Sequence, residues 1–224
     1  MKKILFTIFI FISLVKITDV LMVKFTGLGN PLIYQHSKIF GYDLKNNQSI
    51  KRRGNNISIN DFGMRTNKNW GVNYDKKLLF IGDSVTFGGS IVNNKETFVS
   101  RICEKIKKKN TICGNYSFNG YGIEAISKKL KYRNFDDEDF IIIVIIGNDF
   151  ERGLHSLSVQ PYFSKKIDNF LPALTELFFI VVDKYRNLIR FDFSAISEDK
   201  NLYLKYQVEQ IKEFKKILFS TQKN

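Results

Sequence analysis

The stretch Leu78 to Gly89, which reads LLFIGDSVTFGG, restricts the fold of this chain more than any other part of its sequence. The apolar run Leu78 to Ile81 ends abruptly at Gly82-Asp83-Ser84. An apolar run bounded by glycine and small polar residues is typical of a buried strand. A serine just beyond the carboxyl end of such a strand lies where open α/β sheets bind their ligands. The stretch therefore predicts an α/β fold with Ser84 at its functional edge.

Two more apolar runs follow, and helical patterns separate them. A second strand is expected over 111–118, and the run Phe140 to Ile146 predicts a third. Between the strands, apolar residues recur at helical spacing at Phe98, Ile102, Ile106 and then at Ile126, Leu130. Alternating strands and helices predict a three-layer, doubly wound (flavodoxin-like) parallel sheet. The third run is apolar on both faces, which is typical of an interior parallel strand.

Each predicted strand ends in polar or glycine-rich residues. Ser84 follows the first strand, Asn119-Gly120 the second, and Asn148-Asp149 the third. The carboxyl ends of parallel strands meet at one edge of a sheet, so these groups are expected close together. Acyl transfer needs a nucleophilic hydroxyl and hydrogen-bond donors directed at the developing oxyanion. A nucleotide-binding loop is disfavoured, because no Lys-Ser/Thr follows Gly88-Gly89 and no G-x-G-x-x-G occurs.

These blocks, in this order, resemble the SGNH (GDSL-type) hydrolase family. The first block is Gly82-Asp83-Ser84, the second is the pattern N-x-x-x-x-G-Y-G from Asn115 to Gly122, and the third contains Asn148. The family's leading glycine in the third block is replaced here by Ile146. The resemblance implies Ser84 as the nucleophile, with the backbone N–H of Gly120 and the side-chain amide of Asn148 as oxyanion donors beside the N–H of Ser84. It implies no cofactor and no metal.

The region before the first strand is rich in asparagine and glycine. Phe40-Gly41-Tyr42 and the stretch Ile57 to Arg65 are similar to blocks found in a membrane-anchored bacterial branch of that family. By themselves these residues indicate only turns around Gly63. The chain is accordingly divided into an N-terminal segment over 1–24, an irregular strand- and turn-rich lead-in over 25–75, and an SGNH-like α/β domain over 76–224.

The N-terminus combines Lys2-Lys3 with the uncharged, apolar stretch Ile4 to Val15. This pattern is typical of a signal peptide or a membrane anchor, and an anchor could extend through Val20 to Val23. No Ala-x-Ala follows, so an uncleaved anchor is favoured over a cleaved signal, with a plain hydrophobic helix as the third option. The positive-inside rule then places the globular part outside the cytoplasm.

The histidine and acid that would activate the serine are missing from their expected place. In the SGNH family both come from a C-terminal D-x-x-H block, and this chain has none. Its two histidines are His36 and His155, neither of which has the expected order or partner. Helices are predicted over Pro172 to Ile189, with Leu174, Leu177, Phe178 and Val181 on its apolar face, and over Asn201 to Phe219. Because the family continues into further strands, the sheet is expected to be incomplete at its C-terminal side, which leaves the third strand as an edge.

The net charge bears on the possible partners of the chain, and the cysteines bear on its cellular compartment. The net charge of +13 raises nucleic acid as a partner, but the basic residues are scattered and no recognition motif accompanies them. Solvated surface helices are therefore favoured, with an anionic glycan or lipid surface as the alternative partner. The two cysteines, Cys103 and Cys113, form no CxxC motif. They are expected to be small buried hydrophobes, with a disulfide as the alternative in an exported domain.

Two functions follow as hypotheses. The first is a membrane-anchored, extracytoplasmic serine esterase or O-acyltransferase that acts on a small ester or an acylated carbohydrate through an acyl-serine intermediate. The second is a catalytically inactive or truncated SGNH-like protein with only a binding or remnant role, because no general base is recognisable. The oligomeric state is not predicted by any of these features.

Overall fold

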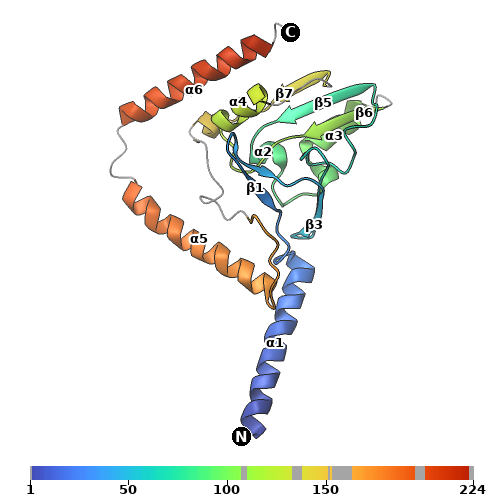
Figure 1. Cartoon of the computed structure of the whole chain (residues 1–224), viewed down its shortest axis with the longest axis vertical. Helices are drawn as coiled ribbons and strands as arrows, with labels where there is room; N and C mark the ends of the chain where they lie inside the picture. Colours follow the sequence, from blue (N-terminus) through green and yellow to red (C-terminus); the bar gives the residue numbers. More distant parts are fainter. Residues whose placement is uncertain are drawn as a thin grey trace.

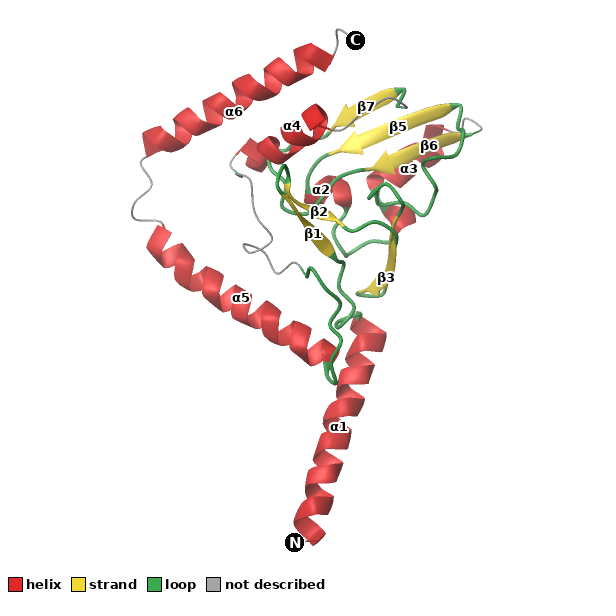
Figure 2. Cartoon of the chain, in the orientation of Figure 1, coloured by secondary structure: helices red, strands yellow, loops and turns green. Residues whose placement is uncertain are grey.

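The computed structural model describes residues 2–106, 110–132, 138–150, 152, 163–194 and 200–221. A long N-terminal helix, α1 (Lys2–Thr26), projects from an α/β body, and two C-terminal helices, α5 (Pro172–Ser194) and α6 (Lys200–Thr221), run along one side of that body (Figure 1). Both C-terminal helices confirm the sequence expectation, each extended by a few residues. The strands gather in the body, away from the free end of α1 (Figure 2).

The body is built on a parallel sheet in the order β6-β5-β7. Its strands are β5 (Lys76–Ile81), β6 (Thr111–Asn115) and β7 (Phe140–Ile143). Leu78 of the central strand pairs with Cys113 on one side and with Phe140 on the other. The strand that leads into Ser84 therefore lies at the centre of the sheet, and its carboxyl end is flanked by the ends of its two neighbours.

Helices cover both faces of this sheet. The connecting helices are α2 (Ser84–Phe87), α3 (Phe98–Ile106) and α4 (Ile123–Tyr132), with 3-10 turns η1 (Asn94–Glu96) and η2 (Gly147–Phe150). Successive side chains of a strand point to opposite faces. Leu79 shares a buried cluster with Ile126 of α4, whereas Phe80 shares another with Val99 of α3. The chain is thus a mixed α/β protein whose three-strand parallel sheet is flanked by helices.

The strand β7 departs from the sequence expectation in length and position. It ends at Ile143 rather than Ile146, and in the described residues it pairs only with β5. The expectation of an interior strand is therefore wrong, while the expectation that it forms an edge is confirmed. Phe140 is exposed and Ile141 is only half-buried. Apolar composition on both faces allows interior burial, but burial also requires a neighbouring strand, and none of the described residues supplies one.

The lead-in forms two antiparallel hairpins. One pairs β1 (Tyr34–Ser37) with β2 (Gly41–Leu44), and the other pairs β3 (Gln48–Arg52) with β4 (Asn55–Ile59). Tyr42, Leu44 and Ile57 belong to the same buried cluster as Leu79 of the central strand. These hairpins thus share the hydrophobic core of the sheet and close it on the side that carries α4.

The two cysteines form a disulfide between Cys103 of α3 and Cys113 of β6. This corrects the favoured expectation of two free buried cysteines and bears out the alternative. The reason is geometric: α3 packs on β6, which brings the two Cα atoms to 5.8 Å, within the range that a disulfide bridges. The bond ties the helix directly to the strand beneath it.

Candidate functional site

Ser84 is the first residue of α2, immediately beyond the central strand. The turn that carries it is tight, because a Cβ atom on Gly82 would lie 2.4 Å from Thr86 Oγ1 and 2.8 Å from the Val144 carbonyl oxygen. Only glycine fits that approach. Asp83 then caps the helix, and its carboxylate accepts a hydrogen bond from Val85 N at 2.9 Å. Ser84 is half-buried, and its Oγ donates to Asp83 Oδ2 at the long distance of 3.3 Å.

Arg152 connects the ends of all three strands, and the sequence reasoning did not identify it. Its Nη1 lies 3.1 Å from Asp83 Oδ2 after β5 and 3.3 Å from Asp149 Oδ1 after β7. The same nitrogen donates to the carbonyl oxygen of Tyr121, beyond β6, at 3.4 Å. Both carboxylates are buried, so the guanidinium compensates their charge where water does not. The predicted convergence of three strand ends therefore exists and has a cation at its centre.

Asp149 carries the clearest electrostatic perturbation at this edge. Desolvation by burial raises its pKa above the usual aspartate range, and the nearby Asp83 acts in the same direction. The hydrogen bond that it accepts from Ile146 N at 2.9 Å and the charge of Arg152 lower the pKa and oppose this shift in part. The Asp149 carboxylate thus stabilises the η2 turn through its hydrogen bond with Ile146 N, and its raised pKa makes it easier to protonate than an exposed aspartate.

The two other predicted site residues occupy the same carboxyl edge. Gly120 follows β6 in a turn with a φ of +79°, a left-handed conformation that favours glycine. Asn148 lies in η2 beyond β7, and its side chain is exposed. Among the described residues, no hydrogen bond joins Ser84, Gly120 and Asn148 to one another. The predicted residues therefore share one edge of the sheet without forming a connected hydrogen-bond network.

The hydrogen-bond donors of these three residues are unengaged. The backbone N–H groups of Ser84 and Gly120, and the side-chain amide of Asn148, donate to no other group in the part of the chain that the structure describes. Gly120 and Ser84 are half-buried residues, and Asn148 is exposed. Within the described residues, this edge therefore offers one hydroxyl and three donors without a hydrogen-bond partner.

Arg65, at the end of the lead-in block, positions the loop that follows α2, and the sequence reasoning missed this role. Its guanidinium is buried and donates to the carbonyl oxygens of Phe87, Gly89 and Val92, the first at 2.7 Å. It also lies over the Phe87 ring, 4.8 Å from the ring centroid. Burial lowers the Arg65 pKa to about 10, which still leaves it charged at neutral pH. The pattern I-N-x-x-G-M-R contained the signal, but its target is distant in sequence.

A general base for Ser84 is not found in the described residues. His36 lies exposed on β1, within a hairpin pair with Tyr42. His155 lies outside the described residues. Asp83 is the one acid whose carboxylate contacts Ser84 Oγ in the described part of the chain, and it is already bound to Val85 N and Arg152. In that same part, no cluster of His, Cys, Asp and Glu could hold a metal ion.

Comparison of the chain with protein-family models, with curated proteins and with solved structures gives no match. The SGNH resemblance therefore remains a prediction from the three motif blocks.

Proposed function

We propose that the chain is a membrane-anchored, extracytoplasmic serine esterase or O-acyltransferase of the SGNH type. Its substrate would be a small ester or an acylated carbohydrate, and the reaction would pass through an acyl-serine intermediate. Ser84 would be the nucleophile, and Gly120 N–H and the Asn148 amide would be the oxyanion donors together with Ser84 N–H. The sheet would be the first part of a flavodoxin-like, doubly wound arrangement, in which chain order 2-1-3 is the starting order.

The observation that carries this proposal is the half-buried Ser84 hydroxyl at the carboxyl end of the central strand, at the same edge of the sheet as three donors that have no hydrogen-bond partner among the described residues. An attacking hydroxyl and donors that are already free of other partners are the components that acyl transfer needs. Ser84 Oγ would attack the ester carbonyl carbon while a base, which the described residues do not supply, takes its proton, and the carbonyl oxygen would take up negative charge. The bond to the alcohol would then break as that proton passes to the departing alcohol, and water or an acceptor hydroxyl would release the acyl group from Ser84. Removing one such donor lowers the rate about 10²–10³-fold in enzymes that use them.

The compartment is supported by two features of the chain. The helix α1 is long and apolar enough to cross a membrane, with Lys2 and Lys3 at its start. Disulfides persist mainly outside the reducing cytoplasm, and Cys103 is bonded to Cys113. Both favour a globular part on the extracytoplasmic side of a membrane.

A second candidate function rests on the missing base. Ser84 must lose a proton as it attacks, and a histidine normally takes it. In the described residues, the hydroxyl contacts only an aspartate that is already committed to Arg152 and to a helix cap. We therefore keep as the alternative a catalytically inactive or remnant SGNH-like protein, in which the same edge only binds a ligand.

Labelling with a fluorophosphonate probe separates the two candidates. The full chain in detergent, its Ser84→Ala variant and its Ser49→Ala variant are treated alike, since Ser49 is an exposed serine of β3. Labelling of the parent and of Ser49→Ala, with none of Ser84→Ala, supports the esterase. Equal labelling of parent and Ser84→Ala shows that Ser84 is not the nucleophile. No labelling of any of the three supports the binding or remnant role, and hydrolysis of p-nitrophenyl acetate then stays at the level of Ser84→Ala.

A further inference from the structure

The apolar face of helix α5 is turned away from the α/β body. Phe178 is 64% exposed, Val181 58% and Tyr185 67%, although their spacing is that of a face that helices normally bury. The side of the same helix that faces the body carries Glu176, which is buried. An exposed contiguous apolar surface of this kind marks an interaction site.

An ion pair holds α5 in this orientation. Arg52, at the end of β3, donates to both carboxylate oxygens of Glu176, at 2.8 and 2.6 Å, and Gly29 N donates to the same carboxylate. A paired guanidinium and carboxylate have a defined relative geometry. Because Glu176 is fixed against the body, the residues on the opposite side of the helix are directed outward.

The start of α5 is attached to the side of α1. The buried carboxylate of Asp19 accepts a hydrogen bond from Leu174 N at 2.9 Å, and the Lys16 ammonium donates to the Phe170 carbonyl oxygen. The ammonium also lies 4.6 Å from the centroid of the exposed Phe170 ring. From this junction α5 diverges from α1 at a wide angle instead of running alongside it (Figure 1). The first turns of α5 are therefore held at the level of α1 residues 16–19.

If α1 spans a bilayer, the junction between α1 and α5 lies near the surface of that bilayer. Lys3 and Lys24 of α1 are separated by roughly 30 Å at 1.5 Å per residue, close to the thickness of a hydrocarbon core. The Asp19 junction then lies about 8 Å on the hydrocarbon side of Lys24. Helices that lie in the membrane interface bury their apolar faces to roughly 5–10 Å. With a modest tilt of α1, such as most spanning helices have, α5 would lie along the bilayer surface.

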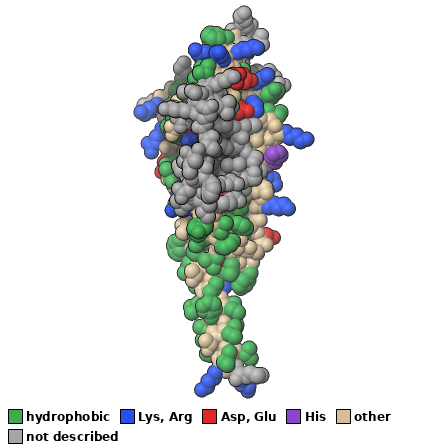
Figure 3. Space-filling model, turned by 90° about the vertical axis from the view of Figure 1, so that its left-hand side faces the viewer, with side chains coloured by type: hydrophobic (Ala, Val, Ile, Leu, Met, Phe, Trp, Pro, Cys, Tyr) green, Lys and Arg blue, Asp and Glu red, His purple; other side chains and the backbone are tan. Residues whose placement is uncertain are grey.

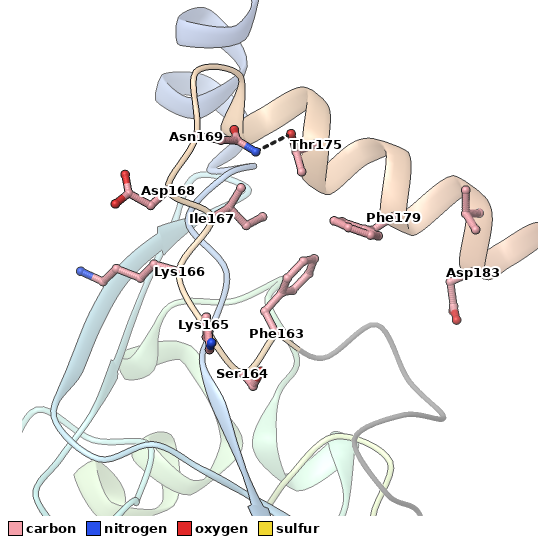
Figure 4. A pocket seen from close by; sticks show the side chains of 11 residues that line it. Phe163, Ser164, Lys165, Lys166, Ile167, Asp168, Asn169, Thr175, Phe179 and Asp183 are labelled. Atoms are coloured by element: carbon pink, nitrogen blue, oxygen red, sulfur yellow. Dashed lines mark hydrogen bonds between the residues drawn. The ribbon is translucent and has the colours of Figure 1, made fainter.

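Hydrophobic side chains are prominent on both sides of this junction (Figure 3). Viewed from the α5 side, they cover α1 and continue up to the described start of α5, with basic side chains at the N-terminal tip. A groove of about 590 Å³ lies on another side of α5, between the helix and residues 163–169. Phe163 and Phe179 approach each other across it, with ring centroids 6.2 Å apart, while Lys166 and Asp168 extend away from it (Figure 4).

Basic groups border this apolar surface at the same level. Lys24 lies in the last turn of α1, and the β3–β4 hairpin places Lys51 and Arg53 beside that helix end, where Arg53 N donates to the Thr26 carbonyl oxygen at 2.6 Å. Lys165 and Lys166 are exposed at the rim of the groove. Lysine and arginine above an apolar face are typical of helices that bind phospholipid surfaces.

We propose that α5 is a second membrane-binding element, an interfacial helix whose Phe178–Tyr185 face inserts into the bilayer that α1 spans. The partner is a phospholipid surface rather than a second copy of the chain, because α5 begins at the side of the membrane helix and basic groups border the junction. The body would then be held at two points, which fixes its orientation and keeps it close to the membrane. The proposal rests on α1 as a membrane anchor.

Fluorescence quenching by brominated lipids tests the depth of α5. Three matched Phe→Trp variants of the full chain are placed in vesicles of phosphatidylcholine and phosphatidylglycerol, with and without bromine on the acyl chains. They are Phe178→Trp on α5, Phe9→Trp on α1 and Phe140→Trp on β7, all at exposed phenylalanines. Trp70 is the one native tryptophan and is buried, so it supplies a constant background. The unsubstituted chain gives that background directly.

The emission of the unsubstituted chain is subtracted from that of each variant. We expect bromine to reduce the remaining emission of Phe9→Trp and Phe178→Trp at least about two-fold, because both side chains would lie among the acyl chains or at their boundary with the headgroups. Phe140→Trp should change no more than the unsubstituted chain. Quenching of Phe9→Trp alone overturns the proposal and leaves the anchor intact. Quenching of neither overturns both. A blue-shifted Phe178→Trp emission that bromine does not reduce assigns the face to a protein partner, such as a second copy, and overturns the proposal.

Discussion

Helices α4 and α5 have apolar faces of the same kind but lie in different surroundings. Ile126 and Leu130 of α4 are buried in the cluster that also contains Leu79 of the sheet. Phe178 and Val181 of α5 are exposed. The spacing of apolar residues therefore predicts a helix in both places, but it does not predict what covers the face. For α4 the cover is the protein itself, and for α5 we infer the bilayer.

The largest effect should come from truncating the buried face of α4. Ile126 is fully buried, so Ile126→Ala should lower the free energy of unfolding by about 2–5 kcal/mol through lost burial and a new cavity. The matched change on α5, Val181→Ala, should cost less than about 0.5 kcal/mol in detergent solution. Urea unfolding of the full chain measures both. Similar losses in the two variants would show that α5 is covered by protein after all.

A smaller loss of unfolding free energy is expected when the disulfide is removed. This bond connects α3 to the sheet, and neither α4 nor α5 has one. In α3 only Val99 is fully buried, and the bond between Cys103 and Cys113 adds a covalent connection to β6. Replacing both cysteines with alanine should cost about 2–3 kcal/mol, as expected for a short closed loop. The same urea titration measures the loss, and a reducing agent should destabilise the parent chain but not the double variant. A parent chain that is insensitive to reduction would contradict the bond.

The smallest effect concerns the buried acid Asp149, in the η2 turn against which α4 and α6 pack. Its raised pKa means that the folded state binds a proton more readily than the unfolded state. Stability that depends on this group therefore increases as the pH falls through the folded pKa, and the gain is complete below the unfolded value. The parent chain should gain stability relative to Asp149→Asn between about pH 7 and pH 4. A difference that stays constant or reverses over this range would contradict burial of the charged carboxyl group.

Much of the fold could be predicted because its signals are local. The run Leu78 to Ile81 and the spacing of Phe98, Ile102 and Ile106 correspond to β5 and α3. The placement of Ser84, Gly120 and Asn148 beyond three successive strands also follows from the sequence, because strand ends of a parallel sheet share an edge. Their role in catalysis remains a prediction.

The parts that could not be predicted depend on contacts between distant residues. Arg152 joins Asp83 to Asp149 with no local pattern to mark the contact, and the pattern that contains Arg65 does not reveal that this residue reaches the carbonyl oxygens after α2. A charged residue in a polar stretch looks the same whether it is solvated or buried. The pairing of Cys103 with Cys113 likewise depends on how α3 lies on β6.

The sequence by itself determined which segments become helices and strands, and that a serine follows the first buried strand. Those properties arise from backbone periodicities of 3.6 and 2 residues, which neighbouring residues set. Only the tertiary structure decided which apolar faces are covered and that Arg152 lies at the meeting point of three strand ends. The physical reason is that burial and ion pairing depend on which distant segment, or which solvent, occupies the space beside a residue.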